Sequence, residues 1–287
     1  MHNAKIILGT AQFGMDYGIN NKNGKISKLN IFEILDYAFS IGINELDTAS
    51  SYGDSENVIG EYLNYYPNKR FIITTKVNDL KISLEKQVYN SLENLKIKKI
   101  DKLFFHSYDI YRHFENEIKD FYQKYKGLLF DELGVSIYTN YEIENLLNDP
   151  FIDRIQLPFN LFDNFNKRGI YLEKLHLNNK KIDARSIFLQ GLFFRNTFDL
   201  PNNLIPLKKD LKGLKKLSEE YRIGFNSIAI GYVNSFKIFD KILIGVDSLE
   251  QLQKNLKCFS NKLPKKLIKK LNSIEIKNEE LLNPSKW

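Results

Sequence analysis

Four polar side chains in the first part of the sequence have the types and the spacing that acid catalysis at a carbonyl group needs. Asp47, Lys76 and His106 each close a short apolar segment, and Tyr52 lies five residues beyond the first of these segments. A tyrosine hydroxyl has a reference pKa of about 10, which makes it a weak acid for this purpose. A neighbouring ammonium group stabilises the phenolate, and we therefore expect Lys76 to lower the pKa of Tyr52.

The other two side chains fit the same scheme. A lysine in a partly dry pocket tends to lose its proton unless it is paired, and Asp47 can supply the counter-charge. His106 can donate a hydrogen bond to the substrate oxygen and orient the substrate. Each residue taken alone also fits a structural role: Asp47 as a helix cap, Lys76 as a surface lysine and His106 as a core histidine. Their shared position after successive apolar segments favours catalysis.

Eight short apolar segments recur along the chain, and helical patterns lie between most of them. Several are nearly continuous in Ile, Leu and Phe, as expected of parallel strands that are covered on both faces. We predict strands at Lys5–Gly9, Ile43–Asp47, Phe71–Lys76, Lys102–His106, Leu129–Ser136, Ile152–Leu157, Lys181–Ile187 and Lys241–Gly245. We predict helices at Ile31–Ser40, Glu56–Tyr65, Leu84–Leu95, Glu115–Tyr125, Leu207–Tyr221 and Ser227–Ser235.

Eight strands alternating with helices predict an α/β protein with a (β/α)8 TIM barrel, and we expect residues 1–287 to form one domain. The alternative is an open doubly wound sheet, which would need a glycine-rich phosphate turn after its first strand. Gly9–Gly14 lacks the G-x-G-x-x-G spacing of that turn. Because active sites of (β/α)8 barrels lie at the carboxyl ends of the strands, we expect the four polar side chains to converge there.

Composition and charge exclude several classes of protein. Cys258 is the single cysteine among 287 residues, so no intramolecular disulfide forms, which suits a reducing compartment. The sequence shows no signal peptide and no run of about 18 apolar residues, and we expect a cytoplasmic protein without a membrane partner. The formal charge is +7. We interpret the lysine-rich helical pattern at 262–271 as a solvated outer face, and we expect no nucleic-acid partner.

The segment Asp47–Gly53 resembles the signature of the aldo-keto reductase family. Lys76 and the segment Leu103–His106 are similar to its other two catalytic positions, and the likeness extends over about Ile6–Asn255. The resemblance implies an NAD(P)H-dependent oxidoreductase with an Asp-Tyr-Lys-His site, in which Tyr52 is the general acid. It also implies a cofactor that is bound without a Rossmann domain.

The resemblance implies positions for a nicotinamide cofactor, and it implies no metal. These positions are Thr10, Ser136, Gln156, Arg185, Ser186, Phe188, Gln190, Gly191, Gly245, Asp247, Ser248, Gln251 and Asn255. Ser136 and Gln156 correspond to the residues that hold the nicotinamide carboxamide. The sequence departs from the family pattern twice, because Ile137 replaces the asparagine that usually follows the serine and Arg185 replaces a tyrosine that commonly stacks on the nicotinamide ring.

The resemblance implies NADP(H) as the cofactor. Ser248-x-x-Gln251 predicts a capping box at the start of the eighth helix, whose free amides suit a 2′-phosphate. Asp247 opposes this choice, because its carboxylate would repel a phosphate and could accept a hydrogen bond from a free 2′-hydroxyl group instead. NAD(H) therefore stays open as the alternative.

A narrower likeness concerns the substrate. Leu8–Gly14, Ile155–Asn160 and Arg185–Gly191 resemble a bacterial branch that is associated with surface-polysaccharide and unusual-sugar biosynthesis. The leading hypothesis is reduction of an aldehyde or ketone of a sugar-derived or other polar metabolite, with anionic and nucleotide-linked sugars as candidates. The alternatives are a broad aldehyde scavenger, a sugar dehydrogenase and a nicotinamide-nucleotide-binding barrel with little turnover.

Arg185 is expected at the same end of the barrel as the four catalytic candidates, where a guanidinium group needs a partner. Three partners are open: the cofactor pyrophosphate, Asp183 or another nearby carboxylate, and an anionic group of the substrate. We favour the substrate, because the guanidinium fork suits a carboxylate or a phosphate.

Overall fold

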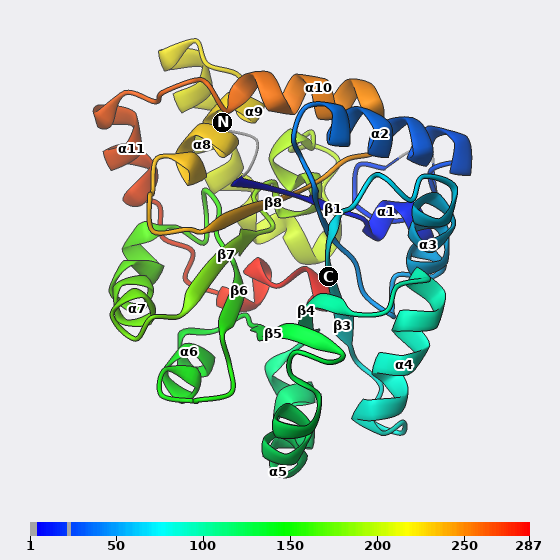
Figure 1. The fold of residues 1–287 in the computed structure, drawn as a ribbon. Helices are drawn as coiled ribbons and strands as arrows, with labels where there is room; N and C mark the ends of the chain where they lie inside the picture. Colours follow the sequence, from blue (N-terminus) through cyan, green and yellow to red (C-terminus); the bar gives the residue numbers. More distant parts are fainter. Residues whose placement is uncertain (1–4, 22–23) are drawn as a thin grey trace.

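The computed structural model describes residues 5–21 and 24–287 and confirms the predicted (β/α)8 barrel (Figure 1). The strands are β1 (Ile6–Gly9), β2 (Glu45–Asp47), β3 (Ile72–Val77), β4 (Ile100–Phe105), β5 (Phe130–Ser136), β6 (Arg154–Pro158), β7 (Lys181–Arg185) and β8 (Lys241–Gly245). They are parallel and follow one another around the barrel in chain order, and β8 pairs with β1 to close it.

Helices surround the strands on the outside, as Figure 1 shows. The α-helices are α1 (Ala11–Gly14), α2 (Lys28–Ser40), α3 (Ser55–Tyr65), α4 (Leu84–Leu95), α5 (Tyr108–Tyr125), α6 (Asn140–Leu146), α7 (Phe165–Leu177), α8 (Lys208–Tyr221), α9 (Phe225–Asn234), α10 (Leu249–Cys258) and α11 (Lys265–Asn272). Short 3-10 helices lie at Leu189–Phe194, Asn202–Leu207, Glu279–Leu282 and Pro284–Lys286. The layers are therefore a strand barrel inside a ring of helices.

The apolar segments form strands because both of their faces are covered. All four residues of β1 are buried, and so are all three of β2 and all five of β6. Gly9 at the end of β1 is paired with Asp47 on one side and with Gly245 on the other. The ends of β2 and β8 therefore flank the end of β1, and residues distant in sequence meet there.

Two predicted strands end earlier than the sequence pattern indicated. The fourth was expected to include His106, but β4 stops at Phe105 and His106 is the first residue of the following loop. The seventh was expected to reach Ile187, but β7 stops at Arg185. The physical reason at β7 is the backbone of Ser186, whose φ of 56° lies in the left-handed region and turns the chain out of the sheet.

The helix start that differs most from the sequence pattern is that of α5. The apolar periodicity indicated a start near Glu115, but α5 begins at Tyr108. The side chain of Ser107 accepts a hydrogen bond from the backbone nitrogen of Ile110 at 3.2 Å and caps the helix. This cap fixes the helix immediately after His106 and thus limits the loop that carries the histidine.

Buried ion pairs fill part of the barrel interior below the carboxyl ends. Asp183 accepts a hydrogen bond from the Nη1 atom of Arg154 at 2.6 Å, and Lys102 is paired with Glu45. Asp183 and Arg185 lie two residues apart on one strand, so their side chains share a face in successive layers. Asp183, one of the three partners left open for Arg185, is instead paired with Arg154.

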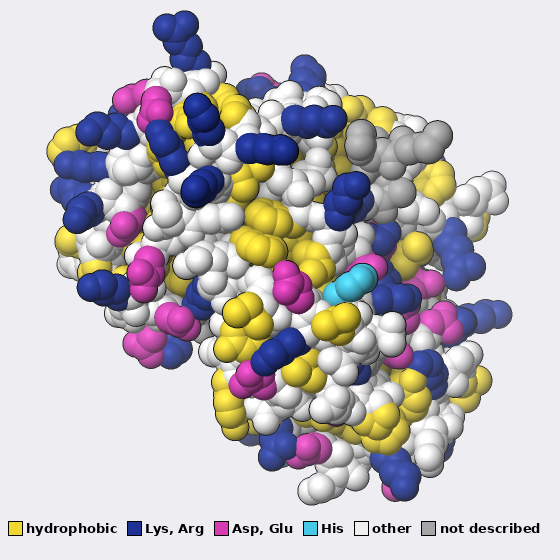
Figure 2. Space-filling model, turned by 90° about the vertical axis from the view of Figure 1, so that its left-hand side faces the viewer, with side chains coloured by type: hydrophobic (Ala, Val, Ile, Leu, Met, Phe, Trp, Pro, Cys, Tyr) yellow, Lys and Arg dark blue, Asp and Glu magenta, His cyan; other side chains and the backbone are white. Residues whose placement is uncertain are grey.

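The lysine-rich segment near the C-terminus forms the amphipathic helix α11, with Leu267 and Leu271 buried and its lysines exposed. Figure 2 shows the side of the molecule that lies to the left in Figure 1, with Lys and Arg side chains spread over it and Asp and Glu among them. Mixed charges of this kind are typical of a solvated face. Within residues 5–21 and 24–287, no helix is both long and apolar enough to cross a membrane.

Candidate active site

The four predicted catalytic side chains line one cavity of about 540 Å³. Asp47 is the last residue of β2, Lys76 is the last but one of β3, and His106 directly follows β4. Tyr52 lies in the loop between β2 and α3. The structure therefore brings together at the carboxyl end of the barrel the residues that the sequence predicted to converge.

Lys76 and Asp47 form a buried ion pair at the floor of this cavity. Their side chains are 1% and 3% exposed, and the Lys76 Nζ atom donates a hydrogen bond to Asp47 Oδ1. Lys76 also donates to the carbonyl oxygen of Thr48 at 2.9 Å, and Gln156 donates to Asp47 Oδ2 at 2.8 Å. Burial lowers the pKa of Lys76, and the negative charge of Asp47 opposes that shift. The predicted counter-charge is thus present.

Tyr52 lies beside this pair, but its acidity differs from the prediction. The Lys76 Nζ atom is 5.3 Å from the centre of the Tyr52 ring, and its hydrogen bonds go to Asp47 and Thr48. Burial raises the pKa of Tyr52, and the charge of Asp47 raises it further. The expectation that Lys76 lowers this pKa is therefore wrong, because burial and Asp47 raise the pKa and the charge of the lysine is paired with Asp47.

His106 is held in the neutral state on the other side of Tyr52. Burial lowers the pKa of His106 to about 3, and the nearby cations Lys76 and Arg185 contribute. The His106 Nδ1 atom is 3.0 Å from the hydroxyl oxygen of Ser51, and the imidazole ring meets the Tyr52 ring edge to face with centroids 5.6 Å apart. A neutral imidazole has one donor and one acceptor nitrogen. In the tautomer in which Nδ1 accepts a hydrogen bond from the Ser51 hydroxyl group, the N–H group of Nε2 is left for a ligand.

The loop that carries Tyr52 is fixed by close backbone packing against α1. A Cβ atom on Gly14 would lie 1.6 Å from the carbonyl oxygen of Tyr52, so only glycine fits there. Ser55 extends the contact, because its hydroxyl group donates to the carbonyl oxygen of Thr10 at 3.0 Å. The position of the loop therefore depends on Gly14, Ser55 and Thr10, and the sequence analysis predicted this role for none of them.

Arg185 lines the cavity and is held by neutral acceptors. Its Nε atom donates to the hydroxyl group of Ser136 at 3.2 Å, Nη1 donates to the hydroxyl group of Ser186 at 3.1 Å, and Nη2 donates to the carbonyl oxygen of Ile137 at 3.0 Å. The guanidinium group also stacks on Tyr138, 4.3 Å from the ring centre. These contacts fix a charged group beside the catalytic candidates.

The segment after β7 forms a strained wall of the same cavity. Ser186, Leu189, Gln190 and Gly191 have φ values of 56°, 48°, 52° and 87°, in the left-handed region. Three of these residues are not glycine, and such conformations cost of order 1 kcal/mol each, so they persist where a site requires them. Ser186, Phe188, Gln190 and Gly191, four of the positions expected to bind the cofactor, all line the cavity.

The β8–α10 end of the cavity agrees with the sequence only in part. Gly245, Asp247 and Gln251 line it, whereas Ser248 and Asn255 do not. Ser248 accepts the backbone hydrogen bond of Gln251 at 3.1 Å, as a helix cap does.

The other side chains that were expected at the adenine end of the cofactor, Gln251 and Asn255, also form hydrogen bonds within the chain. The Gln251 side chain accepts from the backbone nitrogen of Asp247 at 2.6 Å, so the predicted reciprocal bond to Ser248 is replaced by one to the preceding residue. Asn255 is buried and accepts a hydrogen bond from Asn226 at 2.7 Å.

Several side chains that line the cavity were missed at the sequence level. They are Gln12, Met15, Tyr17, Asn20, Asn21, Ser51, Tyr138, Ile187, Phe194, Leu243 and Ser285. Tyr17 and Asn20 lie in an irregular loop without periodicity, and Ser285 comes from the last residues of the chain. Only the fold brings these segments to the site, although Ser51 lies within the signature itself.

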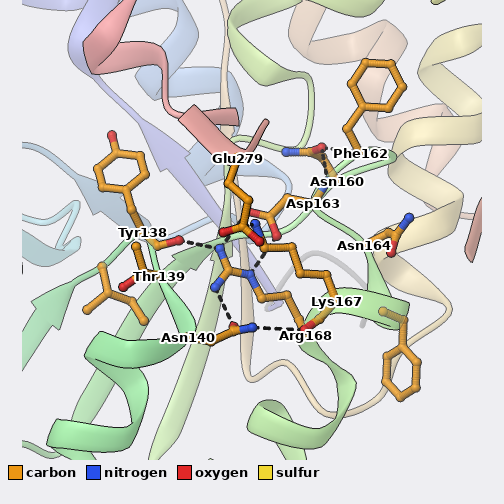
Figure 3. A network of polar contacts seen from close by, with 12 residues as sticks. Tyr138, Thr139, Asn140, Asn160, Phe162, Asp163, Asn164, Lys167, Arg168 and Glu279 are labelled. Carbon is orange, nitrogen blue, oxygen red and sulfur yellow. Dashed lines mark hydrogen bonds and ion pairs between the residues drawn. The ribbon is translucent and has the colours of Figure 1, made fainter. Parts of the chain in front are cut away.

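A buried polar network supports the wall formed by Tyr138 (Figure 3). Arg168 is fully buried and donates to both carboxylate oxygens of Asp163, at 2.6 and 2.7 Å. It also donates to the side chain of Asn140 at 2.7 Å and to the backbone carbonyl oxygen of Tyr138. The network therefore fixes the backbone of the residue on which Arg185 stacks.

Comparisons with known proteins identify the family of the chain and support its fold. The chain is 23% identical over 294 residues to the uncharacterized oxidoreductase YqkF of Bacillus subtilis (strain 168), covering 93% of this chain and 94% of that protein. Its fold is similar to that of the aldo-keto reductase AKR11C1 from Bacillus halodurans (holo form), with a TM-score of 0.70 and 17% identity over 96% of this chain and 94% of the other. The model of the aldo/keto reductase family matches residues 5–276, and the chain therefore belongs to that family.

Proposed function

We propose that this protein reduces an aldehyde or ketone with NAD(P)H, and that Tyr52 protonates the carbonyl oxygen. Family membership implies NAD(P)H-dependent carbonyl reduction. The observation that supports the role of Tyr52 is its place in the cavity between His106 and the buried Asp47–Lys76 pair. Among residues 5–21 and 24–287, none forms a hydrogen bond with the Tyr52 hydroxyl group, which leaves this group to a ligand.

The raised pKa of Tyr52 keeps the phenol protonated but makes it a weaker acid, so the proton transfer depends on a cation that stabilises the phenolate as it forms. Burial and Asp47 keep the phenol neutral, and its Oη atom then gives the proton to the carbonyl oxygen as negative charge develops there. His106 donates from Nε2 to the same oxygen and orients the carbonyl group. Arg185 is the cation whose charge lowers the pKa of Tyr52, and it therefore stabilises the phenolate that remains.

The residues around the cavity fit a nicotinamide dinucleotide, which supplies the hydride when it is bound. The hydroxyl group of Ser136 and the amide group of Gln156 line the catalytic end and would hold the carboxamide. Their present partners, Arg185 and Asp47, are polar groups of the same site. Segment 186–191 would bind the middle of the dinucleotide, and Gly245, Asp247 and Gln251 would bind its far end.

We propose NADH as the preferred reductant, in place of the NADPH that the sequence resemblance implies. Among the described residues that line the cavity, the only lysine is Lys76 and the only arginine is Arg185, and both lie at the catalytic end. Asp247 stands at the far end, and Ser248 and Gln251 bond within their own segment. Within residues 5–21 and 24–287 Asp247 forms no ion pair, and such a carboxylate suits a ribose hydroxyl group better than a phosphate.

The substrate that we propose is a polar metabolite, with a sugar-derived carbonyl compound as the leading candidate. This narrower proposal is supported by the sequence likeness to sugar-biosynthesis relatives. Broad aldehyde scavenging and cofactor binding without turnover are the competing outcomes of the test below. We also propose that the chain acts as one domain, since the family match extends over residues 5–276.

The test is oxidation of NADH and NADPH, followed at 340 nm, with aldoses, deoxy-ketosugars, 4-nitrobenzaldehyde and glyceraldehyde as carbonyl substrates. We expect carbonyl-dependent oxidation, with a higher kcat/KM for sugar-derived substrates than for the aromatic aldehyde. Equal kcat/KM values for all aldehydes would indicate a scavenger. Tight cofactor binding without oxidation would indicate a binding protein and contradict the proposal.

A further inference from the structure

The cavity contains one cation without an anionic partner in the described chain. Lys76 is paired with Asp47, but no carboxylate within residues 5–21 and 24–287 lies within ion-pair distance of Arg185. Asp247 also lines the cavity, but its hydrogen bonds go to Gln251 and Gln12. An arginine that is partly withdrawn from water normally needs a counter-charge.

The hydrogen bonds of Arg185 within the described chain use only some of the N–H donors of its guanidinium group. A guanidinium group has five N–H donors, and three of them are used by Ser136, Ser186 and Ile137. One N–H on Nη1 and one on Nη2 have no acceptor in the part of the chain that the structure describes. Two donors on neighbouring nitrogens suit two oxygens of one carboxylate or phosphate.

The net charge at the catalytic end of the cavity also favours an anionic ligand. Asp47 and Lys76 cancel each other, His106 is neutral, and Arg185 leaves one positive charge. Arg185 is close enough to influence the pKa values of Tyr52, Lys76 and His106, so this charge lies beside the reacting groups. Stacking on Tyr138 keeps the guanidinium group in place without neutralising it.

We propose that the substrate is a carbonyl compound with a carboxylate or phosphate group, and that Arg185 binds this anionic group while the carbonyl oxygen meets Tyr52 and His106. The inference rests on the proposed function and names the substrate class within it. Arg185 is then the residue that determines specificity for an anionic substrate. The pyrophosphate of the cofactor is the competing anion, and the experiment separates the two.

The experiment measures kcat/KM for two matched pairs of substrates with wild type, Arg185→Leu and Arg185→Lys. One pair is succinic semialdehyde and its methyl ester, and the other is glyceraldehyde 3-phosphate and glyceraldehyde. We expect wild type to favour the anionic member of at least one pair, which also shows whether a carboxylate or a phosphate is preferred. Arg185→Leu should lower the anionic-to-neutral ratio roughly 10- to 100-fold, as expected for a hydrogen bond to a charged group. Arg185→Lys keeps the charge without the fork and should give an intermediate ratio.

Two controls make the result specific. Lys254→Gln removes one positive charge from an exposed lysine that is paired with Glu250 on α10, and it should leave the ratio unchanged. Dissociation constants for NADH, measured by fluorescence, report on the cofactor separately. Equal losses on both members of a pair together with weaker NADH binding would assign Arg185 to the cofactor and overturn the inference.

The wild-type ratio decides the question even where Arg185→Leu does not fold. Equal kcat/KM values for the anionic and neutral members of both pairs overturn the inference while leaving carbonyl reduction intact. The absence of any reduction together with the absence of NADH and NADPH binding contradicts the proposed function, and the inference fails with it.

Discussion

At the scale of single residues, His106 shows how the site controls charge. Its pKa falls to about 3 because the imidazole is buried and because Lys76 and Arg185 lie near it. A neutral imidazole can donate from Nε2 while Nδ1 accepts from Ser51. The same shift has a consequence for stability, because the unfolded chain binds a proton at His106 below its ordinary pKa of about 6.5 and the folded chain does not.

We predict that His106 reduces the stability of the protein in acid. Below about pH 6.5 the unfolded state binds a proton at His106 that the folded state does not bind, so the free energy of unfolding falls as the pH falls towards 3. Above about pH 6.5 this contribution of His106 to the free energy of unfolding disappears. The slope is about 1.4 kcal/mol per pH unit, or about 2 kcal/mol between pH 6.5 and pH 5. Urea unfolding of wild type and His106→Gln at pH 7.5 and pH 5 measures it. The same pH dependence in both proteins would show that His106 titrates normally.

At the scale of elements, the structure departs from the sequence prediction mainly in the loops after β7 and β8, which both line the cavity. Propensity and periodicity located both strands, but β7 ends at Arg185 because Ser186 adopts a positive φ that no composition rule signals. The Ser248-x-x-Gln251 pattern correctly indicated a helix start. The side chains of Ser248 and Gln251 form hydrogen bonds within this segment, and Gln251 accepts from the backbone nitrogen of Asp247. The sequence does not indicate which backbone group the Gln251 side chain binds.

We predict that Asp247 makes the protein bind NADH more tightly than NADPH. A carboxylate and a phosphate about 4 Å apart repel each other by roughly 4 kcal/mol per charge pair at an intermediate dielectric, and solvent screening reduces this value. Asp247→Asn should therefore narrow the difference between the two dissociation constants, and Asp247→Arg should reverse it by about tenfold or more. Fluorescence titration with both cofactors measures this. Tighter binding of NADPH by wild type would contradict the prediction.

At the scale of the whole molecule, closure of the barrel makes one site from residues far apart in the sequence. The eightfold alternation of strands and helices was readable because each apolar segment is buried on both faces, and the positions of Asp47, Lys76 and His106 after successive strands predicted their convergence. The acidity of Tyr52 was not readable. The pKa of Tyr52 depends on burial and on the charge of Asp47, which also forms an ion pair with Lys76.

Tertiary packing also brings to the cavity residues that the hydrophobic pattern of the sequence did not indicate. Ser285 at the end of the chain and Tyr17 near its start both line the cavity, and neither lies in a periodic segment. The support of Tyr138 by Arg168 joins β5, α6 and α7 through buried hydrogen bonds, which have no signature in local sequence. The positions of the four catalytic candidates and of segment 185–191 beside the cavity were therefore predictable, whereas the parts of the wall formed by Tyr17, Tyr138 and Ser285 were not.

The central claim, that Tyr52 is the proton donor, is tested most directly by Tyr52→Phe. The substitution keeps the ring that packs against His106 and removes only the hydroxyl group, so the loss should fall on the chemical step. The measurement is the rate of NADH oxidation with a reducible aldehyde at saturating cofactor, together with the dissociation constant for NADH. We predict a rate lower by about 10²- to 10⁴-fold, as is typical of general acid catalysis, with cofactor affinity unchanged. A Tyr52→Phe protein that keeps most of the wild-type turnover would contradict the account.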